Sequence, residues 1–233
     1  MIEMAKRHLK RLNAPKSWKI KAKGLSFITR HNPGPHSGKA SMPLNVILRD
    51  ILQYSSTTRE SKNILTRKNV FVDGIRRDEH KFPVGLFDVI EFKDINKAYR
   101  AVINKKGKIE LLDIKSSESN IKPCKIANKT LLKGKTQLNL NDGKNIIVDK
   151  NSYKTGDTVF LELPKLAIKT HISLKKNVLI YLMGGKHTGE VGKVKDVIGN
   201  RIMYVKENGD IIETLKKYAF VIGENNPLIT VSR

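Results

Sequence analysis

The N-terminal forty residues hold the densest set of side chains that could bind a polyanion. They contain ten lysines and arginines and a single acid, Glu3. Ammonium and guanidinium groups bind phosphates, and flat rings stack on nucleic-acid bases. The sequence therefore predicts a nucleic-acid-binding extension, whose candidate contacts are Lys6, Arg7, His8, Lys10, Arg11, Lys16, Trp18, Lys19, Arg30, His31, His36 and Lys39.

This extension has little apolar surface with which to form a core of its own. Prolines and glycines interrupt it, and aliphatic side chains are sparse. We expect residues 1 to about 40 to be mobile until a polyanion such as RNA orders them. The alternative is a disordered solubilising tail, which runs of charge often form.

A second group of cations lies on a predicted helix pair and hairpin. Apolar residues at helical spacing predict a first helix over residues 43–52. Thr57 and Glu60 have the spacing of a capping box for a second helix, and the dipeptide Asp73-Gly74 predicts a tight hairpin turn. A rigid face of this kind binds phosphates without reordering, although charged helix faces are often only solvated. Its candidate contacts are Arg49, Arg59, Lys62, Arg67, Lys68, Arg76 and Arg77.

The charge imbalance extends over the whole chain. Its 233 residues include 45 lysines and arginines and 22 acids, a formal net charge of +23. Small domains usually carry a net charge of roughly 2–8, so this surplus predicts a polyanionic partner. We expect no membrane association, because the longest apolar run, residues 178–183, is too short to span a bilayer. The single cysteine, Cys124, fits a reducing cytosolic compartment.

Signatures of catalysis or metal binding were not found in the sequence. The six histidines and Cys124 show no metal-ligand spacing. The tripeptide Gly134-Lys135-Thr136 ends like a phosphate-binding loop, but Lys129 stands where the leading glycine is required. We therefore predict no enzymatic activity, no catalytic residue, no metal, no cofactor and no small-molecule substrate.

Short apolar strands and glycine-containing turns dominate the rest of the chain. The predicted fold is α+β and mostly β, in four parts. Residues 1–42 form the basic N-terminal extension, and residues 43–94 form the small helix-pair and hairpin module. Residues 95–172 form a central small β-barrel-like domain without helices, and residues 173–233 form an SH3-like barrel of five strands.

Several fragments of the sequence resemble one protein family. Residues 43–90 resemble the S-four-like RNA-binding module, and residues 184–192 resemble a KOW motif, which adds Lys186 and His187 to the candidate RNA contacts. Over residues 4–231 the chain resembles the archaeal and eukaryotic small-subunit ribosomal protein family of the S-four-e type. The fragments that carry this resemblance are His8-Leu9-Lys10-Arg11, Ala14-Pro15-Lys16-Ser17-Trp18, Gly34-Pro35-His36, Leu48-Arg49, Val72-Asp73-Gly74, Pro83-Val84-Gly85 and Asp88-Val89-Ile90.

The resemblance implies a structural constituent of the small ribosomal subunit, in the cytoplasm, that binds and stabilises ribosomal RNA. Its implied partners are small-subunit ribosomal RNA and neighbouring small-subunit proteins, and its length implies an archaeal member. Two other interpretations stay open at this point. An RNA-modifying enzyme could use the S-four-like module to bind its substrate, and a transcription factor could use the KOW motif on RNA polymerase.

Overall fold

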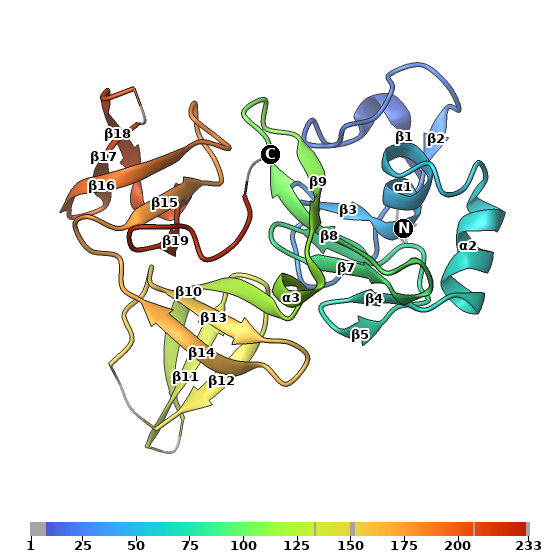
Figure 1. Ribbon diagram of the computed structural model, residues 1–233. Helices are drawn as coiled ribbons and strands as arrows, with labels where there is room; N and C mark the ends of the chain where they lie inside the picture. The colour runs from blue at the N-terminus through green and yellow to red at the C-terminus, as the bar shows by residue number, and fades with distance from the viewer. Residues whose placement is uncertain (1–7, 133, 150–151, 207, 232–233) are drawn as a thin grey trace, which may run out of the picture.

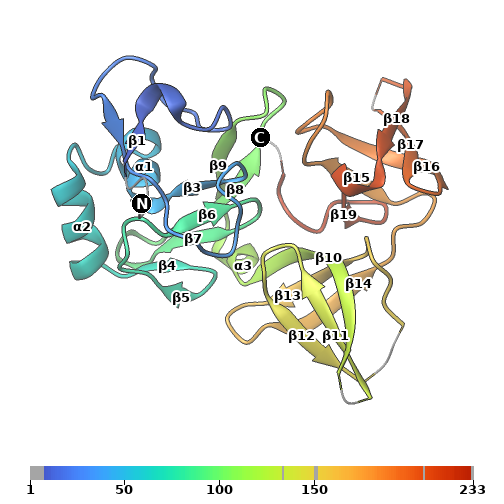
Figure 2. The same cartoon turned by 180° about the vertical axis from the view of Figure 1, so that it is seen from behind.

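The computed structural model describes residues 8–132, 134–149, 152–206 and 208–231. Antiparallel sheets make up most of this structure, and the helices are few and short (Figures 1 and 2). Three five-stranded sheets form three successive units, and two two-stranded ribbons accompany the first. The predicted α+β, mostly β, fold is therefore confirmed. In these described stretches no helix is long and apolar enough to cross a bilayer.

The N-terminal unit combines the helices with the first five-stranded sheet, in the order β5-β4-β7-β8-β9. Its helical elements are α1 (Leu44–Val46), a π-helical turn (Ile47–Ile51) and α2 (Thr58–Arg67). The two ribbons pair β1 with β2 and β3 with β6. The strands are β1 (Leu9–Lys10), β2 (Phe27–Ile28), β3 (Ser41–Pro43), β4 (Val70–Val72), β5 (Ile75–Arg76), β6 (Pro83–Gly85), β7 (Val89–Phe92), β8 (Lys97–Ile103) and β9 (Ile109–Ile114).

Both predicted helices exist, and the second begins where its sequence indicates. The Thr57 hydroxyl accepts a hydrogen bond from the Glu60 amide at 3.2 Å, as an N-cap side chain should. The Glu60 carboxylate accepts from the Ser56 amide at 2.8 Å, one residue before the position that a capping box uses. The first helix differs from the prediction, because after one α-helical turn it widens into the π-helical turn.

The β4–β5 hairpin forms at the predicted dipeptide. Asp73 and Gly74 both have positive φ, 53° and 74°, which a two-residue turn of this twist requires. The first sheet continues across the predicted boundary after residue 94, because β8 pairs with β7. A short connection between β7 and β8 makes the two strands antiparallel neighbours, and the unit ends only after β9.

The central unit is a sheet in the order β12-β11-β10-β13-β14. A one-turn helix, α3 (Ser116–Ser119), precedes it, although no helix was predicted there. The strands are β10 (Ile121–Leu132), β11 (Lys135–Leu140), β12 (Asn145–Val148), β13 (Thr158–Glu162) and β14 (Ala167–Ile172).

The C-terminal unit contains the five strands that the sequence predicts, in the order β18-β17-β16-β15-β19. The polypeptide crosses from the central unit to this one after β14 (Figure 1). The strands are β15 (Leu179–Leu182), β16 (Val191–Ile198), β17 (Arg201–Val205), β18 (Ile211–Leu215) and β19 (Ala219–Gly223).

One buried apolar cluster joins the three units, besides a cluster within the N-terminal unit and one within the central unit. Phe87, from the N-terminal unit, is fully buried and contacts rings of the C-terminal unit. Its ring centroid lies 5.4 Å from that of Tyr181 and 4.8 Å from that of Phe220. Phe160 of the central unit belongs to the same buried cluster. The units therefore have fixed relative positions.

The described part of the N-terminal extension packs on the N-terminal unit, although the sequence suggested that it has too little apolar surface to fold by itself. Trp18 is 2% exposed, and its indole N–H donates to the Ser41 carbonyl at 2.7 Å. Trp18 and Ile28 belong to the same buried cluster as Leu44 and Val72. The extension has no core of its own because its apolar residues complete the core of the following helices and strands. Residues 1–7 lie outside the described residues.

Candidate nucleic-acid interface

The exposed face of α2 carries four of the predicted cations. Arg59, Lys62, Arg67 and Lys68 are all exposed, on the helix itself or on the residue that ends it. Arg76, on β5, is also exposed, and its guanidinium donates to the Thr66 carbonyl at 3.0 Å. That hydrogen bond holds Arg76 beside the C-terminal end of the helix. Five of the predicted cations are therefore exposed on α2, on the residue that ends it and on the adjoining hairpin.

Two predicted cations of this region have partners inside the protein. The Arg77 guanidinium lies 4.4 Å from the centroid of the Phe82 ring, a cation–π contact. Arg49 donates to Asp50 through Nε and Nη2 at 3.1 and 2.8 Å. Both arginines are half-buried, so neither joins the exposed face. Their prediction as phosphate contacts rested on a sequence pattern that did not show these internal partners.

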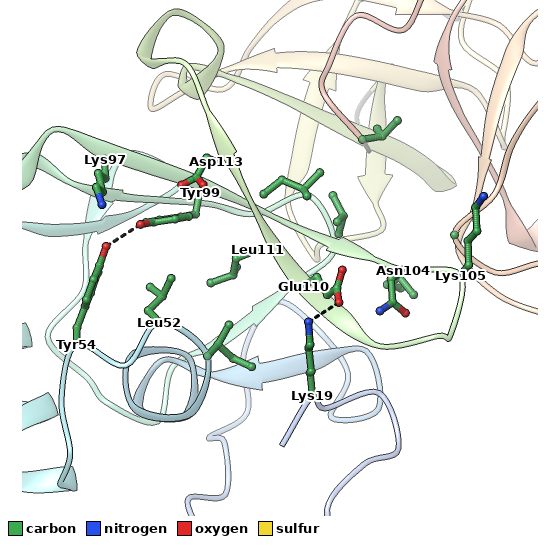
Figure 3. Close-up of a pocket in the computed structure, with 16 residues that line it drawn as sticks. Lys19, Leu52, Tyr54, Lys97, Tyr99, Asn104, Lys105, Glu110, Leu111 and Asp113 are labelled. Atoms are coloured by element: carbon green, nitrogen blue, oxygen red, sulfur yellow. Dashed lines mark hydrogen bonds and ion pairs between the residues drawn. The ribbon is translucent and has the colours of Figure 1, made fainter. Parts of the chain in front are cut away.

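The N-terminal extension divides its predicted contacts between surface and interior. Those exposed are His8, Lys10, Lys16, Lys19, Arg30 and Lys39, while His31 is half-buried. Lys19 forms an ion pair with Glu110 at 2.7 Å (Figure 3). Lys6 and Arg7 lie outside the described residues.

Three predicted RNA contacts of the extension are buried, which corrects their assignment. Arg11 is 8% exposed and donates to the Leu25 and Lys21 carbonyls, both at 3.0 Å. His36 is 9% exposed, and the Trp18 ring lies in the core described above. In this structure these three side chains position the extension rather than offering a surface to RNA.

His36 belongs to a buried ion cluster between the N-terminal and central units. Its Nε2 lies 2.9 Å from the Asp88 carboxylate, which also accepts a hydrogen bond from Lys122 of β10. The Lys122 ammonium further contacts Asp73 at 2.6 Å and Asp142 at 3.1 Å. The Lys122 side chain is 2% exposed, so its charge is neutralised entirely within the protein.

The pKa values in this cluster favour the charged forms. Burial raises the pKa of Asp88, but the charges of Lys122 and His36 outweigh burial and hold it below its ordinary value. Burial lowers the pKa of Lys122, but Asp88 and Asp73 raise it well above the usual value. Buried ion pairs of this cluster therefore link the N-terminal unit to the central unit.

The region that resembles a KOW motif contributes one exposed cation. Lys186 is exposed in the loop between β15 and β16. His187 is half-buried, and its Nδ1 lies 3.4 Å from the Glu190 carboxylate and 3.2 Å from the Lys206 ammonium. His187 therefore interacts with Glu190 and Lys206 inside the protein.

A cleft of about 640 Å³ lies along β8 and β9 (Figure 3). Four of its polar groups form two pairs: the Tyr54 and Tyr99 hydroxyls are 2.6 Å apart, and Lys19 meets Glu110. Burial and the hydrogen bond with Tyr54 raise the pKa of Tyr99, so its phenol stays protonated and is unsuited to abstracting a proton. Among the described residues, no group of three or more His, Cys, Asp or Glu side chains could hold a metal ion.

The structure also exposes residues of the extension that the predicted site omits. Lys21 and Lys23 lie on the surface, and so do Leu25 and Phe27. A signal for Phe27 was present, because Ser26-Phe27-Ile28 follows a lysine-rich segment and strand alternation turns neighbouring side chains to opposite faces. The sequence did not show which of the two apolar side chains faces outward.

Comparisons with known proteins match one ribosomal protein family along almost the whole chain. The model of ribosomal family S4e matches residues 95–168, and the model of the RS4NT (NUC023) domain matches residues 5–39. Small ribosomal subunit protein eS4 of Methanococcus aeolicus is 39% identical over 240 residues, 97% of this chain and 98% of that protein. The eS4 protein of Methanosphaera stadtmanae is 42% identical over 234 residues, 97% of this chain and 96% of that protein.

One solved structure extends this likeness to the fold. The crystal structure of the 30S ribosomal protein S4e from Thermoplasma acidophilum superposes with a TM-score of 0.69 at 30% identity. The superposition covers 79% of this chain and 96% of that one. With archaeal relatives this similar over almost its whole length, the chain belongs to the ribosomal family S4e.

Proposed function

We propose that the chain binds and stabilises ribosomal RNA through the exposed face of α2 and Arg76, together with the exposed cations of the N-terminal extension. The chain is a structural constituent of the small ribosomal subunit, as its family is, and not an enzyme. The RNA-modifying enzyme and the transcription factor considered above are therefore set aside.

The convergence of exposed cations on α2 carries this proposal. Arg59, Lys62 and Arg67 lie on one short, capped helix that ends at Lys68. The hydrogen bond to Thr66 fixes Arg76 beside its C-terminal end. Cations on a rigid element bind phosphates at a smaller entropic cost than cations on a mobile segment. The net charge of +23 supplies the long-range attraction to a polyanion.

The finer assignments of the units belong to the same proposal. We assign the helix pair and the β4–β5 hairpin to an S-four-like module, since two helices precede a tight hairpin. We assign β15–β19 to an SH3-like barrel and the loop before β16 to a KOW motif, supported by five antiparallel strands in one sheet. Neighbouring small-subunit proteins are the other partners, and the cytoplasmic ribosome is the location.

The test compares two quadruple variants of the full-length protein with equal changes of charge. In one, Arg59, Lys62, Arg67 and Lys68 become Gln. In the control, four exposed lysines of β16 and the β13–β14 hairpin become Gln, namely Lys165, Lys169, Lys193 and Lys195. Each lost phosphate contact lowers the slope of log affinity against log salt by roughly 0.7–0.9, so the α2 variant should lose about 3.

The measurement is the affinity for small-subunit ribosomal RNA over a range of salt concentrations. The control variant should weaken binding without the same loss of slope, because its lysines lie outside the unit that carries α2 (Figure 1). Equal slopes for the two variants would place the phosphate contacts elsewhere on the protein. Circular dichroism establishes that both variants stay folded.

A further inference from the structure

The β1–β2 ribbon of the N-terminal extension has an inner and an outer face. Leu9 pairs with Ile28, and Lys10 pairs with Phe27. Ile28 is 5% exposed and joins the core, with Leu9 packed against the same cluster. Since side chains alternate along a strand, Lys10 and Phe27 point to the opposite, outer face.

This outer face presents an aromatic pair and further apolar surface. Phe27 is 55% exposed, and its ring centroid lies 5.6 Å from that of His8, at an interplanar angle of 57°. Leu25, two residues before Phe27, is 68% exposed, and Leu12, in the turn that follows β1, is 85% exposed. We call His8, Lys10, Leu25 and Phe27 the outer platform.

The buried Arg11 fixes the loop that leads into the outer platform. Its guanidinium donates to the carbonyls of Leu25 and Lys21, and its amide donates to the Ser26 carbonyl at 2.9 Å. An ion pair with Asp50 at 3.8 Å connects this arrangement to the π-helical turn. The platform is thus held in place before any partner arrives, which lowers the cost of binding.

The charge around the outer platform identifies its occupant. Residues 8–49 contain no aspartate or glutamate. The exposed cations of the extension are Lys10, Lys16, Lys19, Lys21, Lys23, Arg30 and Lys39. Exposed aromatic rings among cations are typical of single-stranded nucleic-acid sites, where bases stack on the rings and phosphates meet the cations. A duplex keeps its base faces stacked inside and would leave Phe27 unused.

We propose that the outer platform binds an unpaired RNA nucleotide, with the base stacked on Phe27 and the flanking phosphates on Lys10 and its neighbours. This proposal rests on the proposed function and specifies it, since it separates a single-stranded contact at the extension from the phosphate contacts of α2. Phe27 would then contribute stacking, and the lysines would contribute charge.

The test measures the affinity of full-length Phe27→Ala, Phe27→Leu and Phe27→Trp variants at fixed salt. The probes are a short fluorescein-labelled oligoadenylate and an RNA duplex of the same length. Loss of one stacked base should weaken oligoadenylate binding roughly 5- to 150-fold in Phe27→Ala and leave duplex binding unchanged. Phe27→Leu should also lose affinity although it stays apolar, and Phe27→Trp should retain it.

Salt dependence separates this proposal from the proposed function. Phe27→Ala should leave the salt slope unchanged, whereas Lys10→Gln should lower it by roughly 0.7, the single-strand value for one phosphate. Equal losses on both probes, no loss on either, or wild-type affinity in Phe27→Leu would overturn the stacking proposal. So would a variant that binds oligoadenylate normally but is excluded from assembled subunits, because that result would indicate a protein partner. None of these results would alter the α2 experiment.

Discussion

Replacing Lys122 with Met should destabilise the protein more than any single change of a surface charge. The Lys122 ammonium meets the carboxylates of Asp73, Asp88 and Asp142, and the Asp88 and Asp142 side chains are 1% and 0% exposed. At an effective dielectric constant of about 20, one contact near 3 Å is worth roughly 5 kcal/mol before desolvation. Met fills much of the same volume but leaves these carboxylates without their central partner.

Removing one member of a buried ion pair typically costs about 3–5 kcal/mol. For a chain of this size, about 1 kcal/mol shifts the unfolding midpoint by roughly 2–4 °C, so Lys122→Met should lower it by about 6–20 °C. Thermal and urea unfolding measure this effect. Lys176→Met is the control, since the Lys176 side chain is 66% exposed where it pairs with Asp196, and its midpoint should hardly change.

The penalty of Lys122→Met should also shrink as the pH falls. In the wild type, the lowered pKa values of Asp88 and Asp142 contribute stability above the ordinary carboxyl pKa, and this stability is lost as the pH falls through the folded-state values. Without Lys122, Asp88 keeps His36 and Asp142 keeps Lys144, but each loses the largest charge that opposes burial. Their pKa values therefore rise, and protonation in acid relieves part of the penalty of the variant. A variant as stable as the wild type, or a penalty unchanged between neutral pH and about pH 4, would refute this reasoning.

Two further substitutions test local features of the fold. Gly189→Ala should destabilise the protein more than Gly107→Ala. Both glycines have positive φ (79° and 71°), so the backbone strain is similar, but only at Gly189 would the added Cβ clash, 2.4 Å from the Asn104 carbonyl carbon. Equal shifts of the urea midpoint would show that this contact yields easily. Thr57→Ala should cost about 1 kcal/mol through loss of the N-cap, whereas Thr57→Ser should cost little. Urea unfolding checks both variants, and an equal loss in Thr57→Ser would assign the effect to the methyl group instead.

Local features of the structure could be predicted because their signals are local. The Thr57 cap and the Asp73-Gly74 turn each depend on a few consecutive residues, and both formed as predicted. The strands of the C-terminal unit were likewise marked by the glycine-containing turns between them. Strand partners depend on contacts across the chain, so the sequence did not show that β8 continues the sheet of β7.

The burial of charged and aromatic side chains could not be predicted for the same reason. Trp18 looked like a stacking surface because its own neighbourhood is polar, but the apolar residues that cover it come from later helices and strands. Arg11 and Lys10 are adjacent cations with no distinguishing pattern. One is anchored on carbonyls of its own extension, and the other is exposed. Composition therefore predicted a polyanionic partner, but it did not predict which side chains are exposed to it.

The buried cations explain how a chain with so large a charge surplus keeps the proposed RNA-binding face rigid. Strand β10 carries two of them: Lys122 ties it to Asp73 and Asp88 of the N-terminal unit, and Lys125 donates to carbonyls of the C-terminal unit. Burial lowers the pKa of Lys125 to about 8, so most of it stays cationic at neutral pH. Because β10 holds both neighbouring units, the α2 face and the outer platform keep a fixed relation to the rest of the protein. The protein could then bind phosphates and a stacked base together without first ordering its chain. A rigid arrangement therefore loses less conformational entropy on binding than a mobile tail and gains affinity.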